Sequence, residues 1–100
     1  MDVIAFREFC LALPFATEEM PWGDDVIVFK VMGKMFAYSD ISDFTWVGVK
    51  CDPVLATELR ETFPEVGFAS HMSKVHWISV CTDGHLGDSF IKERISDSYS

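Results

Sequence analysis

The sequence predicts an α+β domain in which an antiparallel β-sheet of about four strands has helices packed on one face. Two observations lead to this fold class. Hydrophobic residues recur every three or four positions in three segments, which is the spacing of an amphipathic helix. Four other segments combine β-branched and aromatic residues with nearby turn signals. In chain order the segments run helix, three strands, helix, strand, helix, an order that favours an antiparallel sheet with helices on one side.

The length and composition are those of one domain, and we assign residues 1–100 to a single domain. The 100 residues are 49% hydrophobic and 14% aromatic, which is enough material for one core. No internal repeat or low-complexity tract divides the chain.

The first helix is expected at residues 2–13. Asp2 can cap its N-terminus, and an apolar stripe follows until Pro14, where a helix cannot continue. The next segment, PFATEEMPWGDD at residues 14–25, holds two prolines, a glycine and four carboxylates. It is therefore predicted to be a surface loop, with Trp22 as its aromatic anchor.

The strands follow from short β-rich runs. VIVFKVM and KMFAYSD meet at Gly33 and predict a tight hairpin at about residues 26–39. TWVGVK at residues 45–50 predicts a third strand, and WISVCT, which ends at Asp83-Gly84, predicts a fourth.

Two more helices are expected. Asp52 and Pro53 form a strong helix start, because an Asp side chain accepts the free amide hydrogens and proline fits the first helical position. The second helix is thus predicted at residues 53–63, before Pro64. The third lies in LGDSFIKERISDSYS, and its end is expected to fray.

Charge and cysteine content restrict the function. A net charge of −8 and a pI near 4.6 mean that a nucleic acid is repelled at long range, so any such binding must be local. Cys10, Cys51 and Cys81 are scattered without CxxC spacing, which favours reduced thiols and a cytosolic protein. There is no signal-peptide pattern and no apolar run long enough to span a membrane, so no membrane partner is expected.

No residue pattern indicates a metal, a cofactor or a catalytic residue, and we expect a protein without enzymatic activity. His71 and His76 are five apart, which places them on opposite faces of a continuous strand. Cys81 lies in an apolar strand, where a thiol is usually inert. The loop carboxylates Glu18, Glu19, Asp24 and Asp25 form a cation site, a carboxylate pair for acid–base work or, more commonly for such a group, a solvated cluster.

Four lysines stand in or beside predicted strands among apolar and aromatic residues: Lys30, Lys34, Lys50 and Lys74. On a sheet face open to solvent they would present their ammonium groups beside aromatic rings and bind an anion. The alternative is that they are ordinary strand lysines that discourage aggregation between sheets.

Five motifs resemble the MmcQ/YjbR family of small bacterial proteins. They are PWG at 21–23, VFKVMGKMFA at 28–37, VKCDP at 49–53, ELRETFP at 58–64 and HMSKVHW at 71–77. The resemblance implies a CyaY/frataxin-like α+β fold and a DNA-binding function. It places Lys30, Lys34, Lys50, His71, Lys74, His76 and Trp77 on the family's recurrent polar and aromatic positions.

Two hypotheses follow. The first is a non-enzymatic module whose lysines contact DNA or another anionic partner. The second is a small-molecule or protein-interaction domain with a pocket between the PWG loop and HMSKVHW, prompted by Trp22, Trp46 and Trp77. HMSKVHW itself is predicted to lead into a strand that starts at Trp77 or Ile78. Because neighbouring strand residues face opposite sides, one ring of the His76–Trp77 pair should be buried and the other exposed.

Overall fold

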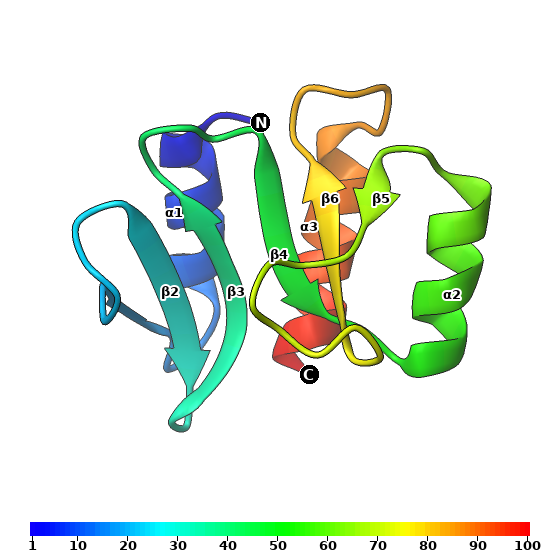
Figure 1. Ribbon diagram of the computed structural model, residues 1–100. Coiled ribbons are helices and arrows are strands. Elements are labelled where there is room, and N and C mark those ends of the chain that lie inside the picture. The colour runs from blue at the N-terminus through cyan, green and yellow to red at the C-terminus, as the bar shows by residue number, and fades with distance from the viewer.

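The computed structural model describes residues 1–100 and shows a six-stranded antiparallel sheet with three helices (Figure 1). The helices are α1 (Val3–Ala12), α2 (Pro53–Thr62) and α3 (Asp88–Tyr99). The strands are β1 (Thr17–Glu19), β2 (Val26–Val31), β3 (Lys34–Asp40), β4 (Trp46–Lys50), β5 (Val66–Gly67) and β6 (Trp77–Cys81). Their order across the sheet is β1-β2-β3-β4-β6-β5. The α+β class and the antiparallel sheet are confirmed. The CyaY/frataxin-like fold stays a prediction of the resemblance.

The expected strand number of about four was too low, because two short strands at the edges of the sheet were missed. β1 lies in the segment expected to be a loop and pairs with β2, and β5 pairs with β6. All three residues of β1 are exposed, so the strand has no buried face that would produce an alternating pattern. Such edge strands form because a neighbouring backbone offers hydrogen bonds, and hydrophobic periodicity does not reveal them.

All three helices contribute to one core on the same face of the sheet. In Figure 1, α1 and α3 lie behind the strands, and α2 stands beside the β5 edge. The core contains side chains from α1 (Phe6, Cys10), α2 (Ala56, Leu59), α3 (Ile91, Ile95) and the inner sides of the strands, including Phe29, Val47 and Ile78. α1 and α3 thus cover one face of the sheet, as predicted, whereas α2 packs against the same core from the β5 edge.

Local signals set the helix starts where the sequence placed them. The Asp2 carboxylate accepts a hydrogen bond from the amide of Ala5 at 2.8 Å. The Asp52 carboxylate accepts from Val54 and Leu55 at 3.1 and 3.2 Å. These bonds satisfy amide groups that have no partner within the helix.

The β2–β3 hairpin turns at two residues with left-handed backbone conformation. Met32 has φ 51° and Gly33 has φ 78°. Two-residue turns with positive φ at both positions match the twist of the strands that they join, which explains the glycine. A register shift between Phe29 and Lys30 then places both Phe36 and Ala37 in the core beneath the helices.

The C-terminal turn of α3 is anchored, so the expectation that it frays was wrong. The Ser98 hydroxyl donates to the Phe36 carbonyl at 2.6 Å and accepts from the Lys50 amide at 2.9 Å. The Tyr99 hydroxyl donates to the Pro14 carbonyl at 2.6 Å. None of the three helices has the length and hydrophobicity needed to cross a membrane.

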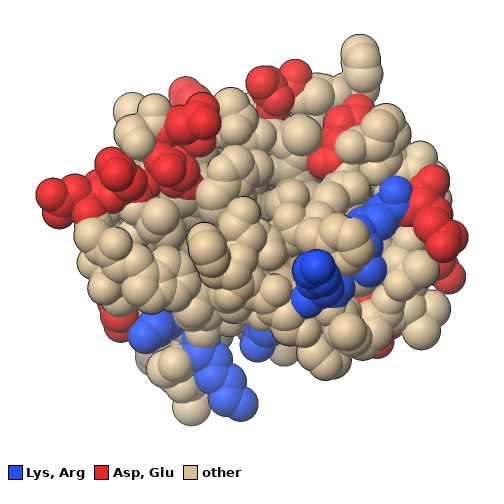
Figure 2. Space-filling view, viewed as in Figure 1, with Lys and Arg blue, Asp and Glu red and all other residues tan.

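Charged residues separate along the strand direction. The β2–β3 turn and the C-terminal end of β4 lie at one end of the sheet, which we call the basic end, and bring Lys30, Lys34 and Lys50 there. The opposite, acidic end carries Asp24, Asp25, Asp40, Asp43 and Asp83. Figure 2 shows acidic residues along the upper edge of this view and basic residues at the lower left, with further acidic and basic residues on the right.

Candidate ligand-binding site

The face of the sheet opposite the helices, here called the open face, has a small hydrophobic cluster of its own. Its buried members are Val28, Tyr38, Ala69 and Trp77, with Val26, Met35, Trp46 and Met72 packed against them. β2, β3, β4 and β6 each supply a side chain by ordinary strand alternation, since residues two apart share a face. The other members of the cluster belong to residues 68–76, which connect β5 to β6 along the chain. We call these residues the crossing segment, because they run over the front of the sheet (Figure 1).

Tyr38 is the centre of this cluster and is 3% exposed. Its ring lies against Gly48 on the neighbouring strand: a Cβ atom at Gly48 would be 2.2 Å from Tyr38 Cε1. The glycine in TWVGVK therefore makes room for the ring. Trp77 packs edge-on against Tyr38, with ring centroids 5.7 Å apart. The position of Tyr38 is thus determined by packing on two sides.

The crossing segment is joined to the sheet through Tyr38. The Tyr38 hydroxyl donates a hydrogen bond to the Ser70 carbonyl at 2.7 Å. Burial raises the pKa of this hydroxyl to about 12, so it remains protonated and able to donate at neutral pH. The next residue, His71, has φ 63°, a left-handed conformation that is uncommon for residues other than glycine. Such strained residues cluster at ligand clamps and active sites.

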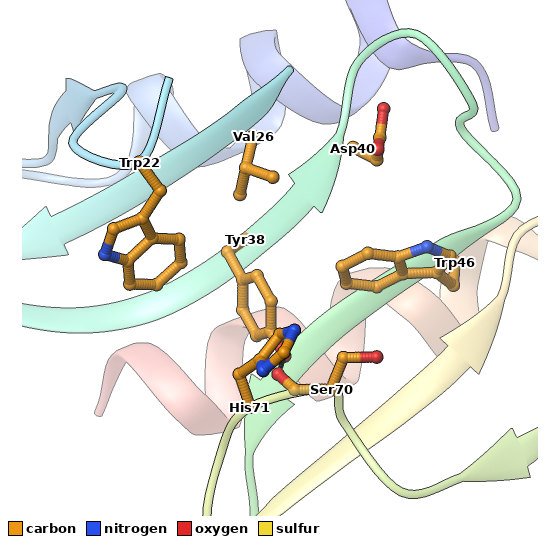
Figure 3. Close-up of a pocket in the computed structure, with 7 residues that line it drawn as sticks. All are labelled: Trp22, Val26, Tyr38, Asp40, Trp46, Ser70 and His71. Atoms are coloured by element: carbon orange, nitrogen blue, oxygen red, sulfur yellow. Dashed lines mark hydrogen bonds between the residues drawn. The ribbon is translucent and has the colours of Figure 1, made fainter. Parts of the chain in front are cut away.

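A cavity of about 600 Å³ opens beside Tyr38 on the open face, and we call it the aromatic cavity. It is lined by Trp22, Val26, Tyr38, Asp40, Trp46, Ser70 and His71. In Figure 3 the indoles of Trp22 and Trp46 stand on either side of the Tyr38 ring, and His71 and Ser70 lie below them. The Tyr38 centroid is 6.2 Å from that of Trp22 and 5.2 Å from that of Trp46, and both pairs are edge-to-face.

Asp40 supplies the one carboxylate of the cavity. Its Oδ1 atom accepts hydrogen bonds from the Ser42 amide, the Ser42 hydroxyl and the Asp43 amide at 2.9, 2.8 and 3.0 Å. These bonds stabilise the charged form, so the hydrogen bonds from Ser42 hold the pKa of Asp40 below its ordinary value. Asp40 is therefore ionised at neutral pH.

The cavity lies where the second sequence hypothesis placed a pocket. It contains Trp22 from the PWG loop and His71 from HMSKVHW, together with Trp46. Sequence reasoning missed Tyr38 and Asp40. Alternation along β3 was a usable signal, because it places these two residues on one face, but their partners across the sheet depend on strand register.

The prediction for HMSKVHW is confirmed. Pairing of β6 begins at Trp77, opposite Lys50. Trp77 is 7% exposed whereas His76 is exposed, so the indole is the buried ring of the pair. Trp77 therefore has little surface with which to contact a nucleic acid, because it is a structural residue of the open-face cluster.

The four lysines do not form one group. Lys34 and Lys50 line the same cavity of about 550 Å³ at the basic end, beside Tyr99 of α3. Lys30 is paired with Glu19 at 3.1 Å. Lys74 lies on the crossing segment, with its ammonium 5.8 Å from the centroid of the exposed Phe68 ring.

The remaining histidine and the acidic loop have separate surroundings. His76 is exposed and shares a shallow surface hollow with Lys50, Asp52 and Asp97. Glu18 accepts two hydrogen bonds from the Arg7 guanidinium, both at 2.7 Å, and these lower the pKa of its carboxyl. No three His, Cys, Asp or Glu side chains come together in an arrangement that could hold a metal ion.

These features define a class of protein: a small α+β domain with helices on one face of an antiparallel sheet and an aromatic cavity on the other. The YjbR family model matches residues 11–100. The chain belongs to the YjbR family, which confirms the resemblance found in its motifs.

Relatives and solved structures match nearly the whole chain. It is 30% identical to the uncharacterized protein YbdF of Escherichia coli O157:H7, covering 94% of this chain and 78% of that protein. It is also 30% identical to the uncharacterized protein YjbR of Escherichia coli K12, covering 99% and 85%. A Deinococcus radiodurans structure superimposes with a TM-score of 0.90 at 33% identity, over 98% of this chain and 75% of that one. A Pseudomonas syringae structure gives a TM-score of 0.84 at 28% identity, over 99% and 97%.

Proposed function

We propose that this protein is a non-enzymatic binding domain that holds a small molecule in the aromatic cavity. The observation that carries the proposal is the cavity itself, which has about 600 Å³ of space, aromatic walls and few polar groups. Ligand sites in proteins typically have volumes of about 300–1,000 Å³, apolar linings and a small number of polar groups that orient the ligand.

Two of the aromatic walls of the cavity, Tyr38 and Trp46, are already held in position, which supports this function. Tyr38 is held by Gly48, Trp77 and the Ser70 carbonyl. The backbone of Trp46 is held by β-sheet pairing and accepts a hydrogen bond from the Ser39 hydroxyl. A ligand that enters a preformed site loses less free energy to ordering of the protein.

The titratable groups support binding rather than catalysis. Burial raises the pKa of the Cys10 and Cys51 thiols, which disfavours the nucleophilic thiolate. Asp40 is the single carboxylate of the cavity, whereas acid–base work by carboxylates commonly uses a pair with separated pKa values. The three free cysteines also support a cytosolic location.

The test is a small-molecule screen that follows melting temperature and tryptophan fluorescence. The compounds are grouped as cationic, neutral and anionic, and each is measured with the parent chain, Trp22→Leu and Phe15→Leu. Trp22 is 56% exposed at the cavity rim, so its loss should leave the fold intact. Phe15 is a matched control, because it is an exposed ring in another loop that does not line the cavity.

We expect at least one class of compound to raise the melting temperature of the parent and of Phe15→Leu, because a ligand that binds only the folded state stabilises it. The same class should give a smaller shift with Trp22→Leu. The proposal would be overturned if no compound raised the melting temperature, or if the melting temperature rose equally in all three proteins.

A second candidate function is the binding of an anionic partner, such as DNA, at the basic end. It is favoured by one observation: Lys34 and Lys50, from neighbouring strands, line one cavity and neither forms an ion pair. Phosphate groups are bound mainly by such lysine and arginine side chains.

Titration with duplex and single-stranded oligonucleotides at about 50 and 200 mM salt tests this candidate, since binding through phosphate weakens strongly over that range. Lys34→Ala and Lys50→Ala should each reduce the slope of log K against log salt by about 0.7 to 0.9. Lys92→Ala is the matched control, because Lys92 is an exposed lysine on α3 that lies over Phe9. Absence of binding at low salt, or an equal effect of Lys92→Ala, excludes the function.

A further inference from the structure

Three aromatic rings line the aromatic cavity. Trp22 and Trp46 flank Tyr38, and the interplanar angles to Tyr38 are 88° and 73°. Rings at such angles form separate walls instead of a stack, as Figure 3 shows. The face of an aromatic ring carries partial negative charge, and tryptophan faces attract cations more strongly than the other rings do.

The charged residues around the cavity also favour a cation over an anion. No lysine or arginine lines it, and Asp40 does. Only one Asp40 oxygen, Oδ1, accepts hydrogen bonds from protein groups, which leaves Oδ2 for a ligand. Asp40 also lies at the acidic end of the sheet, where Asp25 is close enough for its carboxylate to accept a 3.4 Å hydrogen bond from the Ser42 hydroxyl. His71 is the one lining residue with a basic side chain.

We propose that the aromatic cavity binds a small organic cation of the substituted-ammonium class, with the cationic group between the Trp22 and Trp46 rings and near the Asp40 carboxylate. This inference rests on the proposed function, which requires only that the cavity hold a ligand. A quaternary trimethylammonium group suits the site because it has no N–H donors that need hydrogen-bond acceptors, and its methyl groups can pack against aromatic walls. A cation over such rings is attracted more strongly when it is desolvated than when it is exposed to water.

Three probes of nearly equal shape and different charge test the inference. They are choline, the neutral 3,3-dimethylbutan-1-ol and the anionic 3,3-dimethylbutanoate, titrated into the full chain at pH 8, where imidazole is ordinarily neutral. We expect choline to bind about tenfold or more tightly than the alcohol, and the carboxylate to bind least. The chain variants are Asp40→Asn, Trp22→Leu and, as the matched control, Asp43→Asn. Asp43 is an exposed carboxylate of the same loop that does not line the cavity.

Asp40→Asn should weaken choline binding several-fold and leave binding of the alcohol unchanged, whereas Trp22→Leu should weaken both. Asp43→Asn should have little effect on either. Equal or tighter binding of the alcohol or the carboxylate, or no choline binding at millimolar concentration, overturns the cation assignment. So does choline binding that neither Asp40→Asn nor Trp22→Leu reduces. In each case the broader screen decides separately whether the cavity binds a ligand of another class.

Discussion

The contact between Gly48 and Tyr38 shows how one missing side chain shapes the open face. A strand glycine normally weakens a sheet, because it adds no packing and costs more backbone entropy. Here it allows the Tyr38 ring to lie flat over the neighbouring strand, where a Cβ atom would overlap the ring. The ring then serves as the inner wall of the aromatic cavity, and its hydroxyl holds the crossing segment.

Gly48→Ala should destabilise the fold by about 1–3 kcal/mol, the usual cost of overpacking. Urea unfolding measures the change. Gly67→Ala is the control, because a Cβ atom there would meet only Ser79 Oγ at an ordinary 3.5 Å. If the clash is the cause, the double variant Gly48→Ala with Tyr38→Leu should lose less free energy of unfolding than the two single variants lose together. Strict additivity would contradict this explanation.

The raised pKa of Tyr38 predicts a specific loss of stability at high pH. An ordinary tyrosine ionises near pH 10, whereas burial raises the pKa of folded Tyr38 to about 12. Between these values the unfolded chain loses this proton and the folded chain keeps it, so the free energy of unfolding falls as the pH rises from 10 to 12. Denaturant unfolding at each pH tests this in the parent and in Tyr38→Phe. The difference in free energy of unfolding between the parent and Tyr38→Phe should be constant below pH 10 and become smaller above it. A difference that stays constant up to pH 12 would contradict the raised pKa of Tyr38.

At the scale of elements, the end of α3 is attached to the sheet through a single hydroxyl. Ser98 contacts the Phe36 carbonyl at the bulge of β3 and the Lys50 amide at the end of β4. Both backbone groups belong to neighbouring strands that diverge here, since β3 pairs with β4 only through Ala37 and Tyr38. Ser98 therefore satisfies hydrogen-bonding groups that the sheet itself leaves without partners.

Ser98→Ala should destabilise the protein by about 1–3 kcal/mol, because it leaves buried backbone groups without hydrogen bonds. Ser96→Ala on the same helix is the matched control, since the Ser96 side chain makes no hydrogen bond. Thermal unfolding measures both variants. Hydrogen exchange of the Lys50 amide should also accelerate in Ser98→Ala, and unchanged protection of that amide would show that another group replaces the hydroxyl.

At the scale of the whole molecule, the two faces of the sheet differ in what covers them, and its two ends differ in charge. One face is covered by α1 and α3, with α2 at its β5 edge, whereas the other is covered only by the crossing segment and retains a cavity. The acidic end includes Asp40, which lines that cavity, and the basic end carries Lys34 and Lys50. A cation and an anion would thus be attracted to different ends of the same molecule.

Salt should stabilise the free protein. The net charge is −8, and like charges at the acidic end repel one another in the folded state. At 0.1 M salt the Debye length is about 10 Å, so this repulsion is strongly screened. We expect the melting temperature to rise between about 10 and 200 mM sodium chloride, and the rise to be smaller in Asp43→Asn. A fall in melting temperature would mean that the Arg7–Glu18 and Lys30–Glu19 ion pairs outweigh the repulsion.

The sequence by itself determined the features that depend on residues close together in the chain. Asp2 and Asp52 start helices, Gly33 turns a hairpin, and one ring of the His76–Trp77 pair is buried while the other is exposed. Capping, turn geometry and strand alternation act over a few residues, so each is written in the local pattern.

Only the tertiary structure decided which of these elements meet. β1 and β5 exist because neighbouring strands offer them backbone hydrogen bonds, and their own residues carry little pattern. Tyr38 and Asp40 join Trp22 and Trp46 in one cavity because β3 is paired in a particular register and the crossing segment closes over it. These are contacts between residues up to several tens of positions apart. They depend on the packing of the whole chain, and no short window of sequence contains both partners.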